Sequence, residues 1–459
     1  MNIDRRELLL GSVALALNAT AHSAPSGRAS SDTGNSATAA DGFYLSARNP
    51  IANRDQRDLE QLAIQLQARP DVQSAIKRTA DEWARVTEHT VSAEVWAMFP
   101  EQIADYCFRS IQMAVNSDPN YPKVLRVYSP AARWMGNDVP ASRWGAENPD
   151  NAYRIIPVEH GGQYVIRGQR QAISPSYVTY QLVADTNTSI TVGSLEQRDM
   201  EIAADGSFTI TLDDSPDDGR KNHIRLTSDA LYVFARDSMG DWRQTPDALR
   251  VERLNPPTRG PLSPDELAYR AARIMHVGVA ADYYWIRMIL NIPVQTMIKP
   301  MMSGPTGGLV TQVSSSGHFE LADDDAVVIT LDPVTAAYHS LVLYDLWNRS
   351  LDYRNHQSHL NNATIAPDAD GRTTCVISIR DPGIHNWLDT TGLHEVQVGV
   401  RWQGIPGNTL VKPLIDTRVV KIGELASVLP AGVRRTTPAE RARDIAERQQ
   451  LFDRRFIDS

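Results

Sequence analysis

The spacing of apolar and polar residues divides the chain into stretches with different periods. From Asn53 to Pro70, apolar side chains fall on one face of a helix that Pro70 ends. Two more helical patterns cover residues 72–86 and a segment that begins near Pro100. The pattern predicts an α-helical region over residues 42–121, which we expect to pack as a collar against the domains behind it.

Residues 122–258 and 308–425 have a different texture, in which short apolar or alternating runs are separated by Gly, Pro, Asn and Asp. Strands at this spacing indicate β-sandwich or jelly-roll domains. In the first region we expect strands at residues 124–128, 153–158, 163–168, 178–183, 190–192, 200–202, 207–212, 223–226 and 230–235. In the second we expect them at residues 309–313, 318–321, 326–331, 339–345, 362–367, 374–379, 394–400 and 417–422.

A helical segment, residues 259–307, separates the two β regions. Ser263 and Pro264 form a helix start, and apolar residues then recur at helical spacing as far as Ile289. Gly278 weakens the middle of this pattern, so one long helix and two shorter ones both fit it.

The charged pattern near the C-terminus predicts a last helix within residues 426–459. The fold class is therefore α+β, with two antiparallel β-sandwich or jelly-roll-like domains, an N-terminal helical region and a connecting helical segment.

The two β regions also resemble each other in sequence. Asn222 and Arg236 follow an Ala-Asp-Gly turn in the first, as Asn386 and Arg401 do in the second. Duplicated jelly rolls are the simplest explanation, and the shared Asn and Arg then have structural roles.

Composition and charge exclude some classes of protein. Hydrophobic residues make up 42% and charged residues 22% of 459 residues, as in ordinary globular proteins with about two or three domains. A formal net charge of -9 disfavours a nucleic-acid partner, because phosphate binding needs a basic face. Cys107 and Cys375 lie in apolar patterns, so we expect two buried free thiols rather than a disulfide.

The first residues resemble an export signal. Arg5 and Arg6 precede an apolar run at residues 8–17 and a small-residue cleavage pattern. This predicts a twin-arginine-like signal peptide over residues 1–24, although Glu7 departs from the pattern and leaves the general secretory route open. Residues 25–41 then form an expected disordered leader. The mature protein should be periplasmic or secreted and should have no membrane span.

Six of the eleven histidines lie between His318 and His394, which makes this part of the second β region the best place to look for a site. The turn that starts at Asp381 would project His385 and Trp387 from a rim, with His385 as acid or base and Asp381 as its orienting carboxylate. Trp387 could stack on a flat ligand or simply plug the end of the sandwich.

Two further groups carry candidate chemistry. His356 and His359 could share a divalent metal if the local backbone is helical or tightly turned, or they could only hydrogen-bond a loop. Asp150 and Asn151 follow a long polar segment with two tryptophans, which could cover a ligand or enter a strand as a turn. No phosphate-binding loop, dinucleotide fingerprint or nucleophile elbow occurs, so we expect no organic cofactor.

Asn386-Trp387-Leu388 and Arg401-Trp402, with the Asp-Gly turn before them, resemble the bacterial "domain of unknown function 1214" family over about residues 309–404. The resemblance implies β-rich proteins built from paired jelly-roll-like modules, which are frequent in bacteria that degrade steroids, terpenoids and aromatics. It implies a fold better than a function.

Three hypotheses about function remain open. The first is an exported hydrolase or lyase that acts on a small lipophilic or glycosidic molecule. The second is a non-catalytic periplasmic protein that binds carbohydrate or lipid, and the third is a structural envelope protein. For the enzyme, His385, Asp381 and His356 are the predicted catalytic residues. The predicted substrate-binding residues are Asn386, Trp387, Arg401, Tyr353, Asn355, Asp150 and Asn151.

Overall fold

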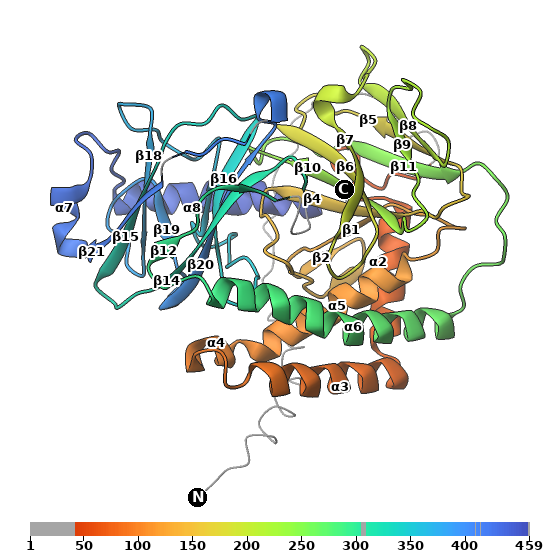
Figure 1. The fold of residues 1–459 in the computed structure, drawn as a ribbon, viewed down its shortest axis with the longest axis horizontal. Helices are drawn as coiled ribbons and strands as arrows, with labels where there is room; N and C mark the ends of the chain where they lie inside the picture. Colours follow the sequence, from red (N-terminus) through yellow and green to blue (C-terminus); the bar gives the residue numbers. More distant parts are fainter. Residues whose placement is uncertain (1–41, 304–308, 409, 414, 458–459) are drawn as a thin grey trace, which may run out of the picture.

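The computed structural model describes residues 42–303, 309–408, 410–413 and 415–457. The predicted signal peptide and leader lie outside the described residues. Two β-sandwiches stand side by side over a layer of helices (Figure 1). The predicted α+β class with two antiparallel β-sandwich domains is confirmed.

The helical layer consists of α2 (Arg54–Gln67), α3 (Pro70–Thr87), α4 (Ala93–Ala97), α5 (Phe99–Val115) and α6 (Pro264–Leu290). Pro70 begins α3 instead of only ending α2, because proline suits the first turn of a helix, where its missing N–H is not needed. The connector is one helix. α6 runs through Gly278 without a break, and the missing Cβ there makes room for Tyr106, whose hydroxyl donates a hydrogen bond to the backbone oxygen of Met275.

The first sandwich has a five-stranded and a four-stranded sheet. The first sheet runs β1 (Leu125–Val127), β4 (Asn151–Pro157), β10 (Tyr232–Ser238), β6 (Tyr177–Val183) and β7 (Thr191–Glu196). The second runs β11 (Ala248–Arg253), β5 (Tyr164–Gln169), β8 (Ser207–Asp213) and β9 (His223–Arg225). A hairpin of β2 (Ala132–Trp134) and β3 (Asn137–Val139) and the strand β11 were not predicted.

The second sandwich repeats this plan. One sheet runs β12 (Thr296–Met297), β14 (Val313–Glu320), β20 (Glu395–Gln403), β16 (Tyr338–Tyr344) and β17 (His359–Asn361), with β13 (Met301–Met302) also on β14. The other runs β19 (Trp387–Asp389), β18 (Thr373–Ser378), β15 (Asp325–Leu331) and β21 (Ile415–Lys421). Strands β4 to β11 thus occupy the positions of β14 to β21, which agrees with an internal duplication.

The echo between Asn222 and Asn386 has one structural cause. The Asn222 side chain accepts a hydrogen bond from the Glu201 N–H at 2.9 Å and donates one to the Glu201 carbonyl oxygen at 2.7 Å. Asn386 makes the same pair of bonds with the backbone of Ala366, at 2.9 and 2.7 Å. The strands predicted at 200–202 and 362–367 are wrong for this reason, because these backbone groups bond an asparagine instead of a neighbouring strand.

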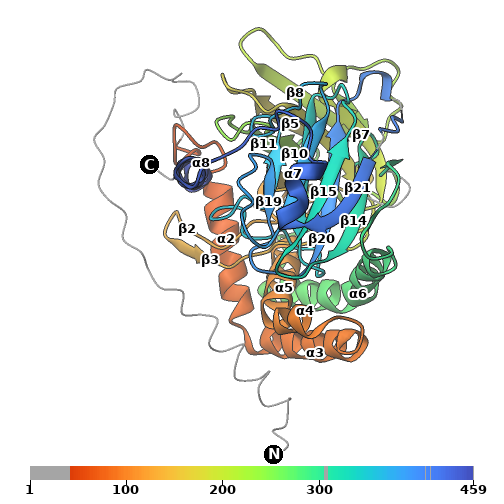
Figure 2. The same ribbon diagram turned by 90° about the vertical axis from the view of Figure 1, so that its left-hand side faces the viewer.

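Each sandwich has its own apolar core between its two sheets, and a third core joins the helices to the outer face of the first five-stranded sheet. Both predicted free thiols, Cys107 and Cys375, are buried and unpaired. After α7 (Leu425–Val428), α8 (Pro438–Asp453) runs along both sandwiches on the side of α2 (Figures 1 and 2). Within the described ranges, every helix is too short or too polar to cross a membrane.

Candidate functional site

The acid and base groups predicted in the second β domain do not meet. Oδ2 of Asp381 accepts a hydrogen bond from Nε of Arg441 in α8, at 3.0 Å. The His385 ring lies between the hydroxyl of Thr436 and the backbone oxygen of Thr364, at 3.3 and 3.1 Å. Burial lowers the pKa of His385. These contacts fix a loop against the C-terminal segment and do not form a shared reaction centre.

His356 and His359 belong to separate networks. Nδ1 of His356 lies 2.8 Å from Oδ2 of Asp389, and the ring is half exposed. His359 is buried, and its two ring nitrogens contact Asp150 at 2.9 Å and Arg448 at 2.8 Å. Because both nitrogens of His359 are engaged by protein groups, the predicted metal-binding pair with His356 does not form in this arrangement.

Asp150, predicted to bind substrate, is a fully buried carboxylate that joins the two β domains. Its Oδ1 accepts hydrogen bonds from Nε1 of Trp242 at 2.5 Å and from Nδ2 of Asn361 at 2.8 Å, besides the one from His359. Oδ2 accepts from the Tyr338 hydroxyl at 2.6 Å. Burial raises the pKa of Asp150, but His359 and these hydrogen bonds outweigh it, and the pKa is lowered. The carboxylate is a structural joint.

The remaining residues predicted to bind substrate around this joint are packed or peripheral. Tyr353, Trp387 and Asn151 are buried. The indole N–H of Trp387 donates to a backbone oxygen of β18, and the guanidinium carbon of Arg441 in α8 lies 5.2 Å from the centroid of its ring. Asn355 is exposed, and its side-chain oxygen accepts a hydrogen bond from Gln449 of α8.

Arg401, the remaining predicted substrate-binding residue, lies in a group of arginines at the junction of the two domains. Arg236 in β10 and Arg401 in β20 occupy equivalent positions in the two repeats, and Arg109 of α5 approaches Arg236 through the neighbouring rings of Tyr128 and Phe234. We call these three residues the arginine cluster. None of the three forms an ion pair with a carboxylate of the described residues. Arginine side chains taken out of water are normally paired, so these three groups are available to an anionic partner.

Neutral oxygen atoms hold two members of the arginine cluster in place. Arg401 donates hydrogen bonds to the Tyr344 hydroxyl and, at 2.5 Å, to the backbone oxygen of Ala146. Arg109 donates to the side-chain oxygen of Asn187 at 3.2 Å and to a neighbouring backbone oxygen. These bonds orient the two guanidinium groups but leave their positive charge uncompensated.

Several buried polar atoms at this junction have no hydrogen-bond partner among the described residues. They include Nη1 of Arg236, Nε of Arg109, Oγ1 of Thr179 and the hydroxyl of Tyr128. Thr179 lies directly opposite Arg236 on β6, so the two side chains share one face of the sheet. Tyr128 has a φ of 57°, a left-handed conformation that is strained for an aromatic residue. An unsatisfied buried donor costs about 1–3 kcal/mol, which a bound acceptor would recover.

Aromatic rings border the arginine cluster. The guanidinium carbon of Arg109 lies 4.0 Å from the ring centroid of Trp144, and that of Arg236 lies 4.2 Å from the centroid of Phe234. The Tyr128 ring is 5.6 Å from both of these rings. Trp144 is only half buried, so the arrangement reaches the molecular surface at this residue. Cations over aromatic faces are attracted to the ring quadrupole.

Two carboxyl groups near the cluster are poor sources of negative charge. Burial raises the pKa of Asp282 in α6 to about 7, although the Arg109 guanidinium acts against this rise. Burial also raises the pKa of Glu147 to about 7, opposed by a hydrogen bond from Ser350. Near neutral pH both groups are partly protonated, and the junction keeps an excess of positive charge.

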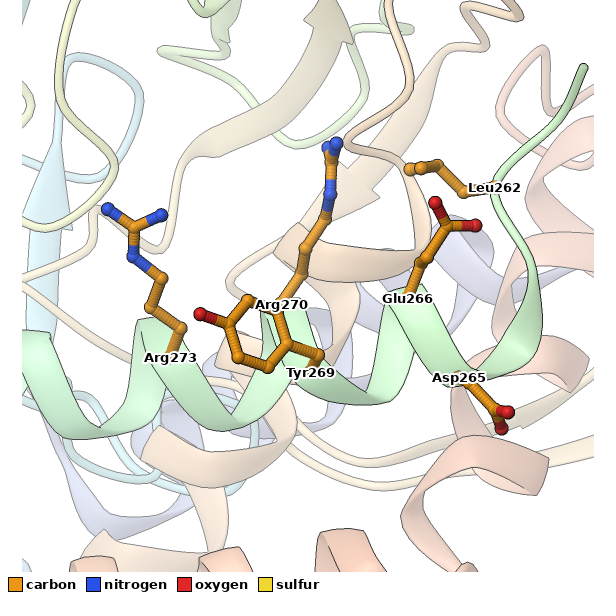
Figure 3. Close-up of a pocket in the computed structure, with 6 residues that line it drawn as sticks. All are labelled: Leu262, Asp265, Glu266, Tyr269, Arg270 and Arg273. Carbon is orange, nitrogen blue, oxygen red and sulfur yellow. The ribbon is translucent and has the colours of Figure 1, made fainter. Parts of the chain in front are cut away.

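A surface hollow of about 550 Å³ lies elsewhere, along the first turns of α6 (Figure 3). It is lined by Leu262, Asp265, Glu266, Tyr269, Arg270 and Arg273. Two of its charged groups already have partners: Glu266 completes the helix cap with Ser263, and Arg270 donates to the backbone oxygen of Ser117 at 2.8 Å. The hollow holds no candidate chemistry from the sequence, so we place the site at the arginine cluster.

Residues 312–404 match the model of the family described as "Protein of unknown function (DUF1214)". The match confirms the predicted resemblance to this family over about residues 309–404. The crystal structure of an uncharacterised protein from Burkholderia cenocepacia is similar over 79% of this chain and 100% of its own, with 26% identity and a TM-score of 0.64. The VPA0106 protein from Vibrio parahaemolyticus is similar over 72% and 100%, with 11% identity and a TM-score of 0.40. No curated protein matches the chain.

The DUF1214 match contains Arg401 and Tyr344, whereas Arg109 and Arg236 lie outside it. The arginine cluster is therefore built jointly by this domain and the rest of the chain. Sequence reasoning named Arg401 as a binding residue and noted Arg236 only as its structural echo. The equivalent positions of Arg236 and Arg401 in the two repeats could have indicated the site, because two arginines at the same place in paired domains can face the same junction. Arg109 lies in an apolar helix pattern and gave no such signal.

Proposed function

We propose that the protein binds a small organic anion with a flat apolar part at the arginine cluster, without an organic cofactor. The observation that carries this proposal is that Arg109 and Arg236 are buried, and Arg401 partly buried, without a carboxylate partner among the described residues. If the export signal operates, the ligand would be met in the periplasm or outside the cell.

The charge of the ligand follows from the cost of burying arginine. A guanidinium group removed from water needs an opposite charge or full hydrogen bonding to offset the lost hydration. Nη1 of Arg236 lacks a partner, and the hydroxyl of Thr179 across the sheet also lacks one. A carboxylate accepts several such bonds at once, and bonds of this charged type are about twice as strong as neutral ones.

The apolar part of the ligand follows from the rings. Trp144, Tyr128 and Phe234 present aromatic surface within a few ångströms of the guanidinium groups. Aromatic side chains stack favourably on flat apolar molecules and exclude water from the charged contact. Aromatic and other ring-containing acids fit both features of the junction.

Binding fits the geometry better than the hydrolase or lyase hypothesis. That hypothesis requires His385 or His356, Asp381 and Arg401 to converge on one space. Asp381 instead bonds α8, His356 bonds Asp389, and Arg401 bonds Tyr344 at the junction. The binding hypothesis needs only the arginine cluster and its rings, so we propose binding as the function.

Thermal denaturation with three matched probes tests the proposal. We expect 1-naphthoate, which has both charge and ring, to raise the melting temperature in a saturable way. The neutral amide of the same ring and acetate, which has only the charge, should each have a much smaller effect. Equal shifts with the acid and its amide would remove the charge recognition on which the proposal rests.

A further inference from the structure

A second cluster of ligand-type side chains lies on the outer face of the second domain, on the face of β20 (Glu395–Gln403) that also carries Arg401. His318 and Glu320 alternate along β14, and Glu395 and Gln397 alternate along the neighbouring β20. The strand register sets His318 opposite Gln397 and Glu320 opposite Glu395. Residues at alternate positions and in direct register share one face, so the four side chains form a square.

The opposite face of the same two strands forms the core of the sandwich. Phe319, Val396 and Val398 are fully buried there, which fixes the register and turns the square outward. One ligand-type atom from each of His318, Glu320 and Glu395 lies within 4.8 Å of the others. His318 and Glu395 are buried, whereas Glu320 is exposed and opens the square to solvent.

The hydrogen bonds of His318 match those of a metal ligand. Nδ1 faces the backbone oxygen of Ile292 at 3.4 Å, and Nε2 faces Oε1 of Glu395 at 3.0 Å. If Nδ1 carries the proton and donates to the carbonyl, the lone pair of Nε2 points at a carboxylate oxygen. A metal-bound imidazole has this pattern, with its other nitrogen donating to a backbone carbonyl. Only a shared cation, either a proton or a metal ion, lets the two acceptors face each other.

Gln397 provides an independent observation at this square, a buried amide oxygen that could act as a ligand. Its side chain is 3% exposed, and its Oε1 has no hydrogen-bond partner among the described residues. It stands directly beside His318 on the shared face. A buried amide oxygen without a donor is costly, and a metal ion at the centre of the square would satisfy it.

We propose that His318, Glu320, Glu395 and Gln397 bind one divalent transition-metal ion, with Zn²⁺ as the best fit. Imidazole nitrogen and carboxylate oxygen bind Zn²⁺ at about 2.0–2.2 Å, which sets tetrahedral ligands roughly 3.3 Å apart. The 3.0 Å between His318 and Glu395 is close to that value. This site is independent of the proposed anion binding, because it shares no residue with the arginine cluster.

The site is tested by titrating Zn²⁺ into the full chain after a chelator has removed bound metal. A chromophoric chelator that competes for Zn²⁺ reports the affinity and the number of ions bound per chain. We expect one Zn²⁺ per chain and an affinity that falls at least about tenfold in Glu320→Gln, because Glu320 is the exposed ligand and its replacement spares the core. Glu252→Gln, a matched exposed strand carboxylate, should leave the affinity unchanged. Circular dichroism of each variant verifies that the fold is intact.

His394 provides the control for adventitious binding. Its ring nitrogens contact Glu94 at 2.9 Å and Asp323 at 3.0 Å in an exposed group nearby. His394→Gln should keep the zinc affinity of the wild type. Loss of binding in His394→Gln with retention in Glu320→Gln would overturn the assignment. Absence of stoichiometric binding would also overturn it, and would leave His318 and Glu395 as an ordinary ion pair that shares a proton.

Discussion

Oδ1 of Asp150 and Nε2 of His359 lie 2.9 Å apart at the centre of the molecule, although 209 positions separate them in the chain. Asp150 belongs to the segment that enters β4 of the first domain, and His359 begins β17 of the second. Arg448 of α8 contacts the other nitrogen of this ring at 2.8 Å. One buried hydrogen-bond chain therefore connects both sandwiches and the C-terminal helix.

Asp150→Asn should strongly destabilise the protein. Asparagine has nearly the same shape, but its NH₂ group must face donors such as Nε1 of Trp242 and Nδ2 of Asn361. We expect the free energy of unfolding to fall by about 3 kcal/mol, the cost of breaking a buried charged network. Urea denaturation measures this value. Asp218→Asn, at an exposed turn, should cost little, and similar losses in both variants would contradict the structural role of Asp150.

Asp282→Asn should change how stability depends on pH. Burial raises the pKa of Asp282 from 3.8 to about 7 in the folded protein. The folded protein binds the proton of the Asp282 carboxyl group more tightly than the unfolded chain does. The stability that this proton provides is complete below the pKa of the unfolded chain and is lost as pH rises through 7. At pH 8 the variant should be more stable than the wild type by on the order of 3 kcal/mol, with little difference at pH 4. Melting temperatures at both values measure the effect, and a constant difference would contradict it.

Gly399→Ala should disturb the arrangement that holds Arg401. A Cβ at Gly399 would lie 2.9 Å from the ring of Tyr344, whose hydroxyl accepts a hydrogen bond from Arg401. Overpacking of this kind typically costs about 1–3 kcal/mol. Gly423→Ala is the matched control, because nothing lies within 4 Å of its added carbon. Equal urea midpoints for the two variants would show that Tyr344 yields without cost.

Much of the fold could be predicted from sequence, because period-two apolar runs and turn residues act locally. Two of the wrongly predicted strands share a physical cause. Residues 200–202 and 362–367 carry strand-like patterns, but the side chains of Asn222 and Asn386 bond their backbones across the turn. Such a bond depends on a partner about twenty positions away, which local periodicity does not show.

The candidate site was less predictable. The cluster of histidines attracted attention to His356, His359 and His385, but each of these rings satisfies a structural hydrogen bond. The arginine cluster joins three elements that are far apart in sequence, so only the fold brings Arg109 and Arg236 to Arg401. Residue type alone cannot tell a buried unpaired arginine from a solvated one.

Isothermal titration of 1-naphthoate into the wild type and Arg236→Met tests the central claim most directly. Arg236 is the member of the cluster with an unpartnered Nη1, and methionine keeps much of its apolar length. Loss of a charged hydrogen bond of about 1.5–3 kcal/mol should weaken binding by roughly ten- to a hundredfold. Arg225→Met, an exposed arginine of β9, should bind as the wild type does. Failure of the wild type to bind, or equal affinities for wild type and Arg236→Met, would contradict the account.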